Sequence, residues 1–137
     1  GQLLSLVGFG PIVGVDLSED MLAEAGKKGV YDELRMMRLG DELDFPDDGF
    51  AAILCVGTLT PGHAGPETIE ELLRIVRPGG RIIFSLRADE GIDPGYGEII
   101  EHLQFDGRWR HVESSPAFPG MPGKSVEILH RIHVYSK

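Results

Sequence analysis

The stretch of sequence that decides the fold is Ile12-Val13-Gly14-Val15-Asp16-Leu17-Ser18. Its first five residues form a short apolar run that ends in an acid, which is typical of a β-strand, and serine favours the N-cap of a helix. We therefore predict a strand over residues 12–16 that leads directly into a helix. That helix should end near Gly29, because glycine favours a helix C-terminus, and should carry on its inner side Met21, Leu22 and Ala25.

Strands and helices alternate along the rest of the chain. Residues 66–77 place apolar side chains at helical spacing, with glutamates early and arginines late, so they predict a helix. The apolar spacing from Tyr96 to Leu103 predicts another. Residues 52–56 are apolar at every position, which is typical of a strand covered on both faces near the centre of a parallel sheet. Further strands are predicted over residues 34–39, 81–86, 109–114 and 126–135.

The connection between the last two strands decides their relative direction. Residues 116–123 contain prolines that exclude a helical crossover. Two strands without a crossover pair antiparallel. The whole pattern predicts one α/β domain over residues 1–137, with a mostly parallel sheet and a C-terminal antiparallel hairpin.

The composition argues against nucleic-acid binding, a membrane segment and an internal disulfide. The 137 residues carry 13 Lys+Arg against 22 Asp+Glu, a net charge of -9, and no basic run suited to nucleic acid. The apolar runs have the length of strands, far below the ~20 residues that span a bilayer, so we expect no membrane segment. The single cysteine, Cys55, lies in an apolar run and cannot form an internal disulfide. We expect a core thiol in a reducing, cytoplasmic protein.

Histidines and short motifs predict no metal or hydrolase site. The even positions of residues 126–135 are mostly apolar and should face inward, which places His130 inward and His133 on the opposite side. These two imidazoles therefore cannot share one ion. No zinc pattern, G-x-S-x-G elbow, P-loop or H-E-x-x-H motif is present.

Polar residues at the predicted carboxyl ends of strands are the candidates for chemistry, because open parallel sheets bind ligands there. The two oxygens of Asp16 match a vicinal diol such as that of ribose, but Asp16 could equally cap the helix that begins at Ser18. Asp41 could meet an adenine amino group or belong to a solvated acidic loop. Thr58, Thr60 and His63 follow the apolar strand, in a loop that could carry reacting groups or polar residues needed only for solubility.

Four segments, taken together, resemble one family. They are GFGPIVGVDLS at residues 8–18, DFPDDGF at 44–50, CVG at 55–57 and LRIVRPGG at 73–80. Their order and spacing resemble the class I S-adenosylmethionine-dependent methyltransferases, and within them the methyltransferase-like branch named for the Williams-Beuren region. The resemblance covers nearly the whole chain and implies a Rossmann-like methyltransferase sheet. Its reversed last strand argues against a nicotinamide dehydrogenase, whose sheet normally lacks that strand.

The resemblance also implies which residues hold S-adenosylmethionine. Asp16 would bind the ribose, and Leu17 and Met21 would pack near the adenosine. The acids along the adenine would be Asp41 and Glu42. The residues flanking the methionine end would be Cys55, Val56 and Gly57, continuing to Thr58.

The implied reaction is methyl transfer to a small-molecule acceptor. His63 would face the acceptor, and Thr58 is the second candidate catalytic residue. Transfer from a sulfonium is an in-line displacement that depends on alignment more than on a strong base, so proximity could supply much of the acceleration.

The chain departs from the family pattern where it begins. Family members open with an apolar strand and a glycine-rich turn of the form D-x-G-x-G-x-G, whereas residues 1–7 here resemble the end of the helix that follows this turn. We therefore expect an N-terminally truncated domain in which cofactor binding is impaired. The alternative function is a non-catalytic interaction or structural module that keeps the fold without the cofactor.

The departure also predicts a gap at the centre of the sheet. About five buried apolar side chains at roughly 1.5–3 kcal/mol each would be missing, on the order of 10 kcal/mol. That is comparable with the net stability of a whole domain, ~5–15 kcal/mol. We expect either that residues 1–7 rearrange into the gap or that a second copy pairs there to form a homodimer.

Overall fold

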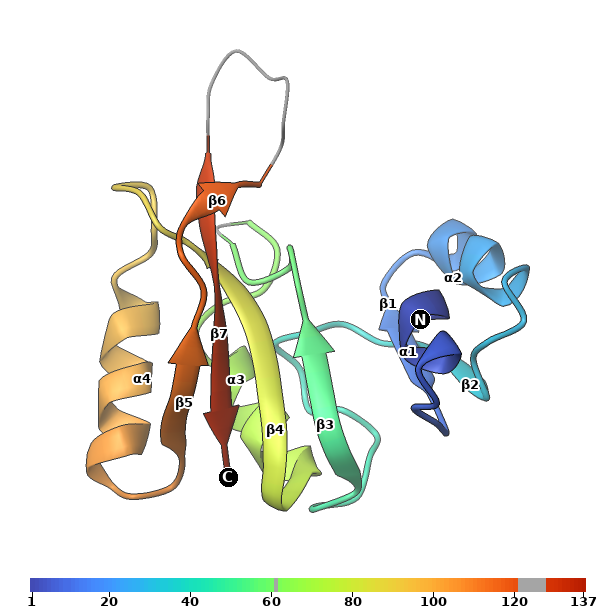
Figure 1. The fold of residues 1–137 in the computed structure, drawn as a ribbon, viewed down its shortest axis with the longest axis horizontal. Coiled ribbons are helices and arrows are strands. Elements are labelled where there is room, and N and C mark those ends of the chain that lie inside the picture. The colour runs from blue at the N-terminus through green and yellow to red at the C-terminus, as the bar shows by residue number, and fades with distance from the viewer. Residues whose placement is uncertain (61, 121–127) are drawn as a thin grey trace. The chain divides into compact units, whose positions relative to one another are not determined.

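The computed structural model describes residues 1–60, 62–120 and 128–137, which form two compact units. The first unit is Gly1–Leu43 and the second is Asp44–Lys137. Each unit has a sheet of its own, and Figure 1 traces the chain through both. The single domain over residues 1–137 stays a prediction.

The first unit is built on a two-stranded parallel sheet. Strands β1 (Val13–Asp16) and β2 (Glu33–Met36) pair in register from Val13 opposite Glu33 to Asp16 opposite Met36. Helix α2 (Glu19–Gly26) connects them, as parallel strands require a crossover. The predicted step from strand to helix at residues 12–18 is confirmed.

Side-chain hydrogen bonds fix this connection. Ser18 is the N-cap of α2, and its Oγ accepts the Met21 N–H at 3.3 Å. Oδ2 of Asp32, just before β2, accepts the Ile12 N–H at 2.6 Å. Serine and aspartate, whose side-chain oxygens readily accept backbone N–H groups, therefore stabilise the ends of these elements.

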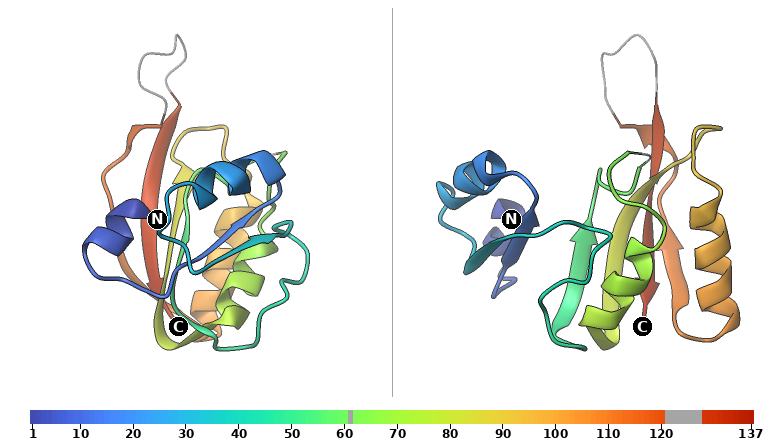
Figure 2. Two further views of the ribbon diagram at one scale, coloured as in Figure 1. Left: turned by 90° about the vertical axis from the view of Figure 1, so that its right-hand side faces the viewer. Right: turned by 180° about the vertical axis from the view of Figure 1, so that it is seen from behind.

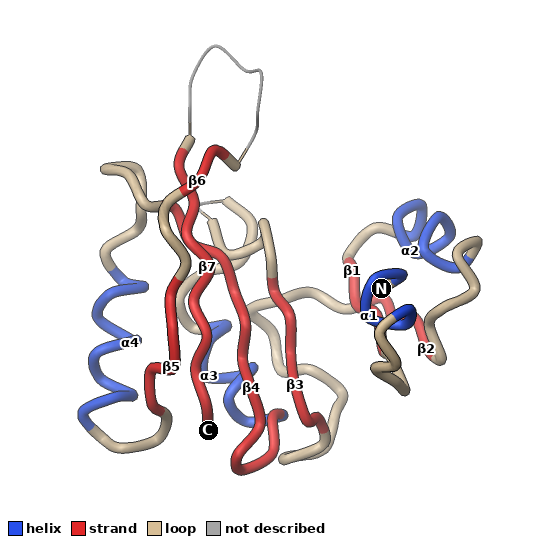
Figure 3. The backbone as a smooth tube through the Cα atoms, in the orientation of Figure 1, coloured by secondary structure: helices blue, strands red, loops and turns tan. Residues whose placement is uncertain are grey.

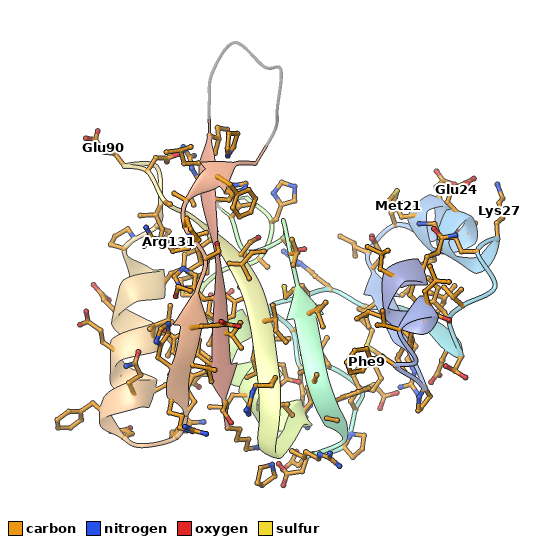
Figure 4. The ribbon with its side chains drawn as sticks, in the orientation of Figure 1. Phe9, Met21, Glu24, Lys27, Glu90 and Arg131 are labelled. Carbon is orange, nitrogen blue, oxygen red and sulfur yellow. The ribbon has the colours of Figure 1, made fainter. Side chains whose placement is uncertain are left out.

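The prediction that Met21 faces inward is wrong. Its side chain is 58% exposed and projects to the same outer side of α2 as Glu24 and Lys27 (Figure 4). Leu22 and Ala25 are half-buried instead. A sheet of two strands covers only a narrow stripe of a helix, which leaves Met21 outside it.

Helix α1 (Gln2–Leu6) precedes β1 in the first unit. The segment is helical, as the resemblance implies, and it pairs with no described strand. The expectation that residues 1–7 rearrange to fill the gap in the sheet is therefore wrong in that they supply no strand, and the alternative, a homodimer, stays a prediction. None of the described helices is long and apolar enough to cross a membrane.

The second unit carries a larger sheet with the strand order β3-β4-β7-β5 (Figure 3). A short strand, β6, pairs with β7. In chain order the elements are β3 (Phe50–Cys55), α3 (Thr68–Ile75), β4 (Val76–Arg87), α4 (Gly95–Phe105), β5 (Arg110–Ser114), β6 (Phe118–Pro119) and β7 (Leu129–Ser136).

This sheet is mixed rather than mostly parallel. β3 and β4 are parallel, but β7 is antiparallel to β4, β5 and β6. The antiparallel pairing of the last two predicted strands is confirmed. The reversed strand lies between β4 and β5, so it makes ladders on both sides, and this is why the sheet is mixed. Residues 121–127, which include part of the predicted connection and strand, lie outside the described residues.

The core of the second unit lies between the sheet and its two helices. Figure 2 shows α3 and α4 on the same face of the sheet. Toward them β4 turns the buried side chains Ile82, Phe84 and Leu86. An aromatic stack continues this layer, with ring centroids of Trp109 and Tyr135 4.0 Å apart.

Strand β3 is not covered on both faces as predicted. Among the described residues it pairs with β4 alone, and Leu54 is 51% exposed. Ile53 is half-buried and Cys55 is buried. The apolar composition indicates that the strand can be buried, but a second partner strand and a second covering layer decide whether it is.

In strand β7 the odd-numbered residues His133 and Tyr135 face the core, whereas the prediction placed the even-numbered residues there. His133 stacks on the buried Phe84 with ring centroids 5.6 Å apart, and Tyr135 is buried on the same side. The even positions Ile132 and Val134 are only half-buried. His130 and His133 do lie on opposite faces, but His133 is the inward one.

Candidate functional site

Asp16 is the last residue of β1, so it lies at the carboxyl end of the strand, where the sequence predicts a ligand site. Its Oδ1 accepts the Ser18 N–H at 2.9 Å, so the carboxylate does help to begin α2. Among the residues that the structure describes, none donates to Oδ2. One oxygen therefore serves the helix and the other can accept a hydrogen bond from a ligand hydroxyl.

Apolar side chains stand beside this carboxylate without cover from their own unit. Leu17 follows Asp16 directly and is 65% exposed, and Met21 lies four residues further along. Exposed apolar side chains next to a polar anchor are typical of ligand sites. Three of the predicted residues, Asp16, Leu17 and Met21, thus lie close together in the chain, at the end of β1 and the start of α2.

The acidic segment follows β2 in the same unit. The Met37 N–H donates to the Asp16 carbonyl at 3.1 Å, so the chain that leaves β2 passes Asp16. Asp41 lies in a tight turn, with a bridge to Leu39, and both Asp41 and Glu42 are exposed. Their exposure agrees with a solvated loop as well as with a ligand contact.

A second group of predicted residues follows β3 in the second unit. Cys55 is buried, and burial raises the pKa of its thiol to about 11, while a hydrogen bond with Thr58 lowers it in part. This thiol is neutral at physiological pH and is a core residue. Val56 and Gly57 are exposed beyond it, and Thr58 is half-buried.

His63 lies in the loop that follows Thr58. It is exposed, and its N–H donates to the Thr60 carbonyl at 3.1 Å. The next residue, Ala64, is buried and forms bridges to Leu59 and Thr60. The loop is therefore folded back on itself, with His63 at its surface.

Two residues that hold this loop were missed by the sequence analysis. The Gly57 N–H donates to Ser85 Oγ of β4 at 2.8 Å. The Tyr96 hydroxyl of α4 donates to the Ala64 carbonyl. Neither Ser85 nor Tyr96 belongs to a motif, and a hydroxyl that bonds a distant backbone leaves no signal in the periodicity of a sequence.

A polar cluster on β5 and β7 was also missed. His111 Nε2 lies 2.8 Å from Ser114 Oγ, which lies 3.0 Å from His133 Nδ1. The register shifts between His111 and Glu113, so a β-bulge brings His111 and Ser114 to the same face. Burial, with Arg131 and His111 nearby, lowers the pKa of His133. No three His, Cys, Asp or Glu side chains in the described part of the chain could hold a metal ion.

Comparison with known proteins places the chain in a family. Residues 1–84 match the family described as a methyltransferase domain. The chain belongs to this methyltransferase family. The match spans all of the first unit and the second unit as far as Phe84, so it includes every predicted cofactor residue.

Relatives of known name agree with this assignment. The chain is 33% identical over 114 residues to methyltransferase-like protein 27 of Homo sapiens, covering 80% of this chain and 46% of the relative. It is 36% identical over 80 residues to demethylmenaquinone methyltransferase of Symbiobacterium thermophilum, covering 54% of this chain and 32% of the relative. The chain thus spans less than half the length of these two relatives.

Solved structures share the fold. An S-adenosylmethionine-dependent methyltransferase from Mesorhizobium loti matches 99% of this chain and 84% of its own, with a TM-score of 0.68 and 16% identity. At this level of identity the likeness concerns the fold alone. The methyltransferase-like α/β fold with a mixed sheet is therefore confirmed.

Proposed function

We propose that this methyltransferase domain transfers a methyl group from S-adenosylmethionine to a small-molecule acceptor. The observation that carries the proposal is Asp16, a carboxylate at the end of β1 with one oxygen engaged by Ser18 and the other open to a ligand. The family match includes this residue. The bound cofactor would supply an electrophilic methyl group on its sulfonium.

The residues of the first unit fit the nucleoside part of the cofactor. Asp16 Oδ2 accepts a ribose hydroxyl, which is a charge-assisted hydrogen bond. Leu17 and Met21 offer exposed apolar surface to the adenosine. Asp41 and Glu42 lie along the adenine.

For the reacting end of the cofactor, the family resemblance implies residues that lie in the second unit. Cys55, Val56 and Gly57 flank the methionine part of the cofactor, with the neutral Cys55 thiol adding no charge. Thr58 and His63 face the acceptor and align it for in-line displacement, which needs position more than a strong base. The acidic composition and the name of the bacterial relative, which acts on a demethylmenaquinone, support a small molecule as the acceptor.

A second candidate is an oligomeric interaction module without catalysis. The observation that favours it is the unpaired edge of β3 among the described residues, where Leu54 is exposed. Such an apolar edge is a template for a strand of a second copy, which would form a homodimer. Light scattering over a dilution series tests this association, and a monomer at every concentration would exclude it.

Calorimetric titration with S-adenosylhomocysteine tests the leading proposal. We expect the unmodified chain to bind with impaired affinity and Asp16→Ala to bind about tenfold or more weakly still, because a charge-assisted hydrogen bond contributes ~1.5–3 kcal/mol. Asp16→Asn keeps an acceptor for the Ser18 N–H and controls for helix capping. Asp20→Ala removes a nearby exposed acid and should leave binding unchanged. Binding that survives Asp16→Ala unaltered would refute the ribose contact.

A further inference from the structure

The loop after β3 is held near both of its ends by hydroxyl groups from other elements. At its start, the Gly57 N–H donates to Ser85 Oγ at 2.8 Å across 28 residues of sequence. At its end, the Ala64 carbonyl accepts the Tyr96 hydroxyl across 32 residues. Both hydrogen bonds lie within the second unit, and both cross from the loop to an element of its core.

The anchoring side chains are buried, whereas the loop residues that matter chemically are exposed. Ser85 and Tyr96 are both almost fully buried. Leu59 and Ala64 fill the inner side of the loop. Gly57 and His63 are exposed. The loop is therefore held on its buried side and accessible to solvent on the other.

The backbone at Gly57 explains why one hydrogen bond can set its direction. Gly57 has a φ of +78°, a left-handed conformation that favours glycine, and nothing lies near the position that a side chain would occupy. Because Gly57 has no side chain that could pack against its surroundings, the hydrogen bond to Ser85 orients the peptide group between Val56 and Gly57.

The Tyr96 anchor keeps its proton over the whole physiological range. The pKa of its hydroxyl is raised to about 12. Burial is the largest cause, and the charges of Asp93 and Glu67 act in the same direction. A neutral phenol donates steadily to the Ala64 carbonyl. The carbonyl belongs to a buried residue, so losing this donor removes a hydrogen bond from a buried acceptor.

We infer that Ser85 and Tyr96 are positioning residues of the methyltransferase site. Ser85 holds the Gly57 peptide where the methionine end of the cofactor binds, and Tyr96 holds the end of the loop that presents His63 to the acceptor. Neither side chain touches the reacting atoms in this account. The inference rests on the proposed function, because it needs the cofactor to bind at Gly57.

Hydrogen exchange of single amides tests the anchoring without any ligand. Ser85→Ala should speed exchange of the Gly57 amide about fivefold, the equivalent of ~1 kcal/mol for one hydrogen bond. Tyr96→Phe should speed exchange of the His63 amide while the ring still packs. Ser85→Thr keeps the hydroxyl and should restore the Gly57 value. Ser114→Ala removes a hydroxyl from β5 and should alter neither amide.

Titration with S-adenosylhomocysteine tests the positioning role on the same variants. We expect Ser85→Ala to bind about fivefold more weakly, with Ser85→Thr and Ser114→Ala close to the unmodified chain. Unmodified protein that binds no S-adenosylhomocysteine would overturn the proposed function and this role with it. Binding that Ser85→Ala leaves unchanged would overturn the positioning role alone. Unchanged Gly57 exchange in Ser85→Ala would overturn the anchoring itself.

Discussion

Two leucine-to-alanine substitutions in neighbouring strands compare the stability contributed by the helix-covered face of the second sheet with that contributed by its exposed edge strand. Leu86 in β4 is 3% exposed, whereas Leu54 in β3 is 51% exposed. The chemistry removed is identical, so the difference in the free energy of unfolding reports burial. Leu86 faces the helix-covered core, and Leu54 lies on the edge strand of its own sheet, where about half of its side chain is exposed.

The expected magnitudes follow from these exposures. Leu86→Ala should lower the free energy of unfolding by about 3 kcal/mol, because it removes buried methyl groups and leaves a cavity. Leu54→Ala should cost about 1 kcal/mol, since full burial of leucine contributes ~1.5–3 kcal/mol and half of this side chain is already in water. With an m-value of about 1.5 kcal/mol/M, the urea midpoints should fall by about 2 M and about 0.7 M.

Urea unfolding followed by tryptophan fluorescence is the assay. The chain has one tryptophan, Trp109, which is buried in the second unit and so reports on that unit. Leu86→Val gives a graded value if the alanine variant is too unstable to purify. Equal losses for Leu54→Ala and Leu86→Ala would mean that β3 is covered in solution, and the edge position of β3 would be refuted.

Three further outcomes are expected. Cys55 should resist iodoacetamide at pH 8 until urea is added, because its pKa is about 11, and labelling of the native protein at the rate of free cysteine would contradict its burial. The stability that the neutral forms of Cys55 and Tyr96 contribute to the second unit should be fully present below about pH 9 and be lost as the pH rises toward 11 and 12, because their folded pKa values are raised to about 11 and about 12 from 9.0 and 10.0. A urea midpoint that stays level from about pH 8 to about pH 11.5 argues against this. Ser18→Ala should destabilise α2 by about 1 kcal/mol and speed its amide exchange about fivefold, whereas Ser5→Ala, which removes an exposed hydroxyl from α1, should leave α2 unchanged.

Elements governed by local patterns were predictable from the sequence. Residues 66–77 contain the helix α3 because apolar spacing and charge placement act within a few turns. Ser18 caps α2 because the capping hydrogen bond spans only three residues. The direction of β7 followed from the prolines before it, which is again a local constraint.

Burial and long-range pairing were not predictable in the same way. The apolar run at residues 52–56 predicted a strand, but the sequence does not say which neighbours cover Leu54. The inward face of β7 was predicted wrongly, because its even positions look more apolar than the Tyr135 and His133 side that packs on Phe84.

The candidate site shows the same division. Asp16 could be found because it ends a strand and precedes a cap. One of its oxygens accepts the Ser18 N–H, and the ribose contact of the other stays a prediction. Ser85 and Tyr96 could not be found, since each acts through a backbone atom about 30 residues away. His111 and Ser114 share a face only because of a β-bulge, which the alternation of side chains does not reveal.

A double-mutant cycle between Asp16 and the ribose hydroxyls tests the central claim most directly. Calorimetry would compare S-adenosylhomocysteine with an analogue that lacks both ribose hydroxyls, each against the unmodified chain and Asp16→Ala. We predict that removing the hydroxyls weakens binding about tenfold or more in the unmodified chain and very little in Asp16→Ala, a coupling energy of at least ~1.4 kcal/mol. Equal losses in the two proteins would contradict the assignment of Asp16 as the ribose ligand.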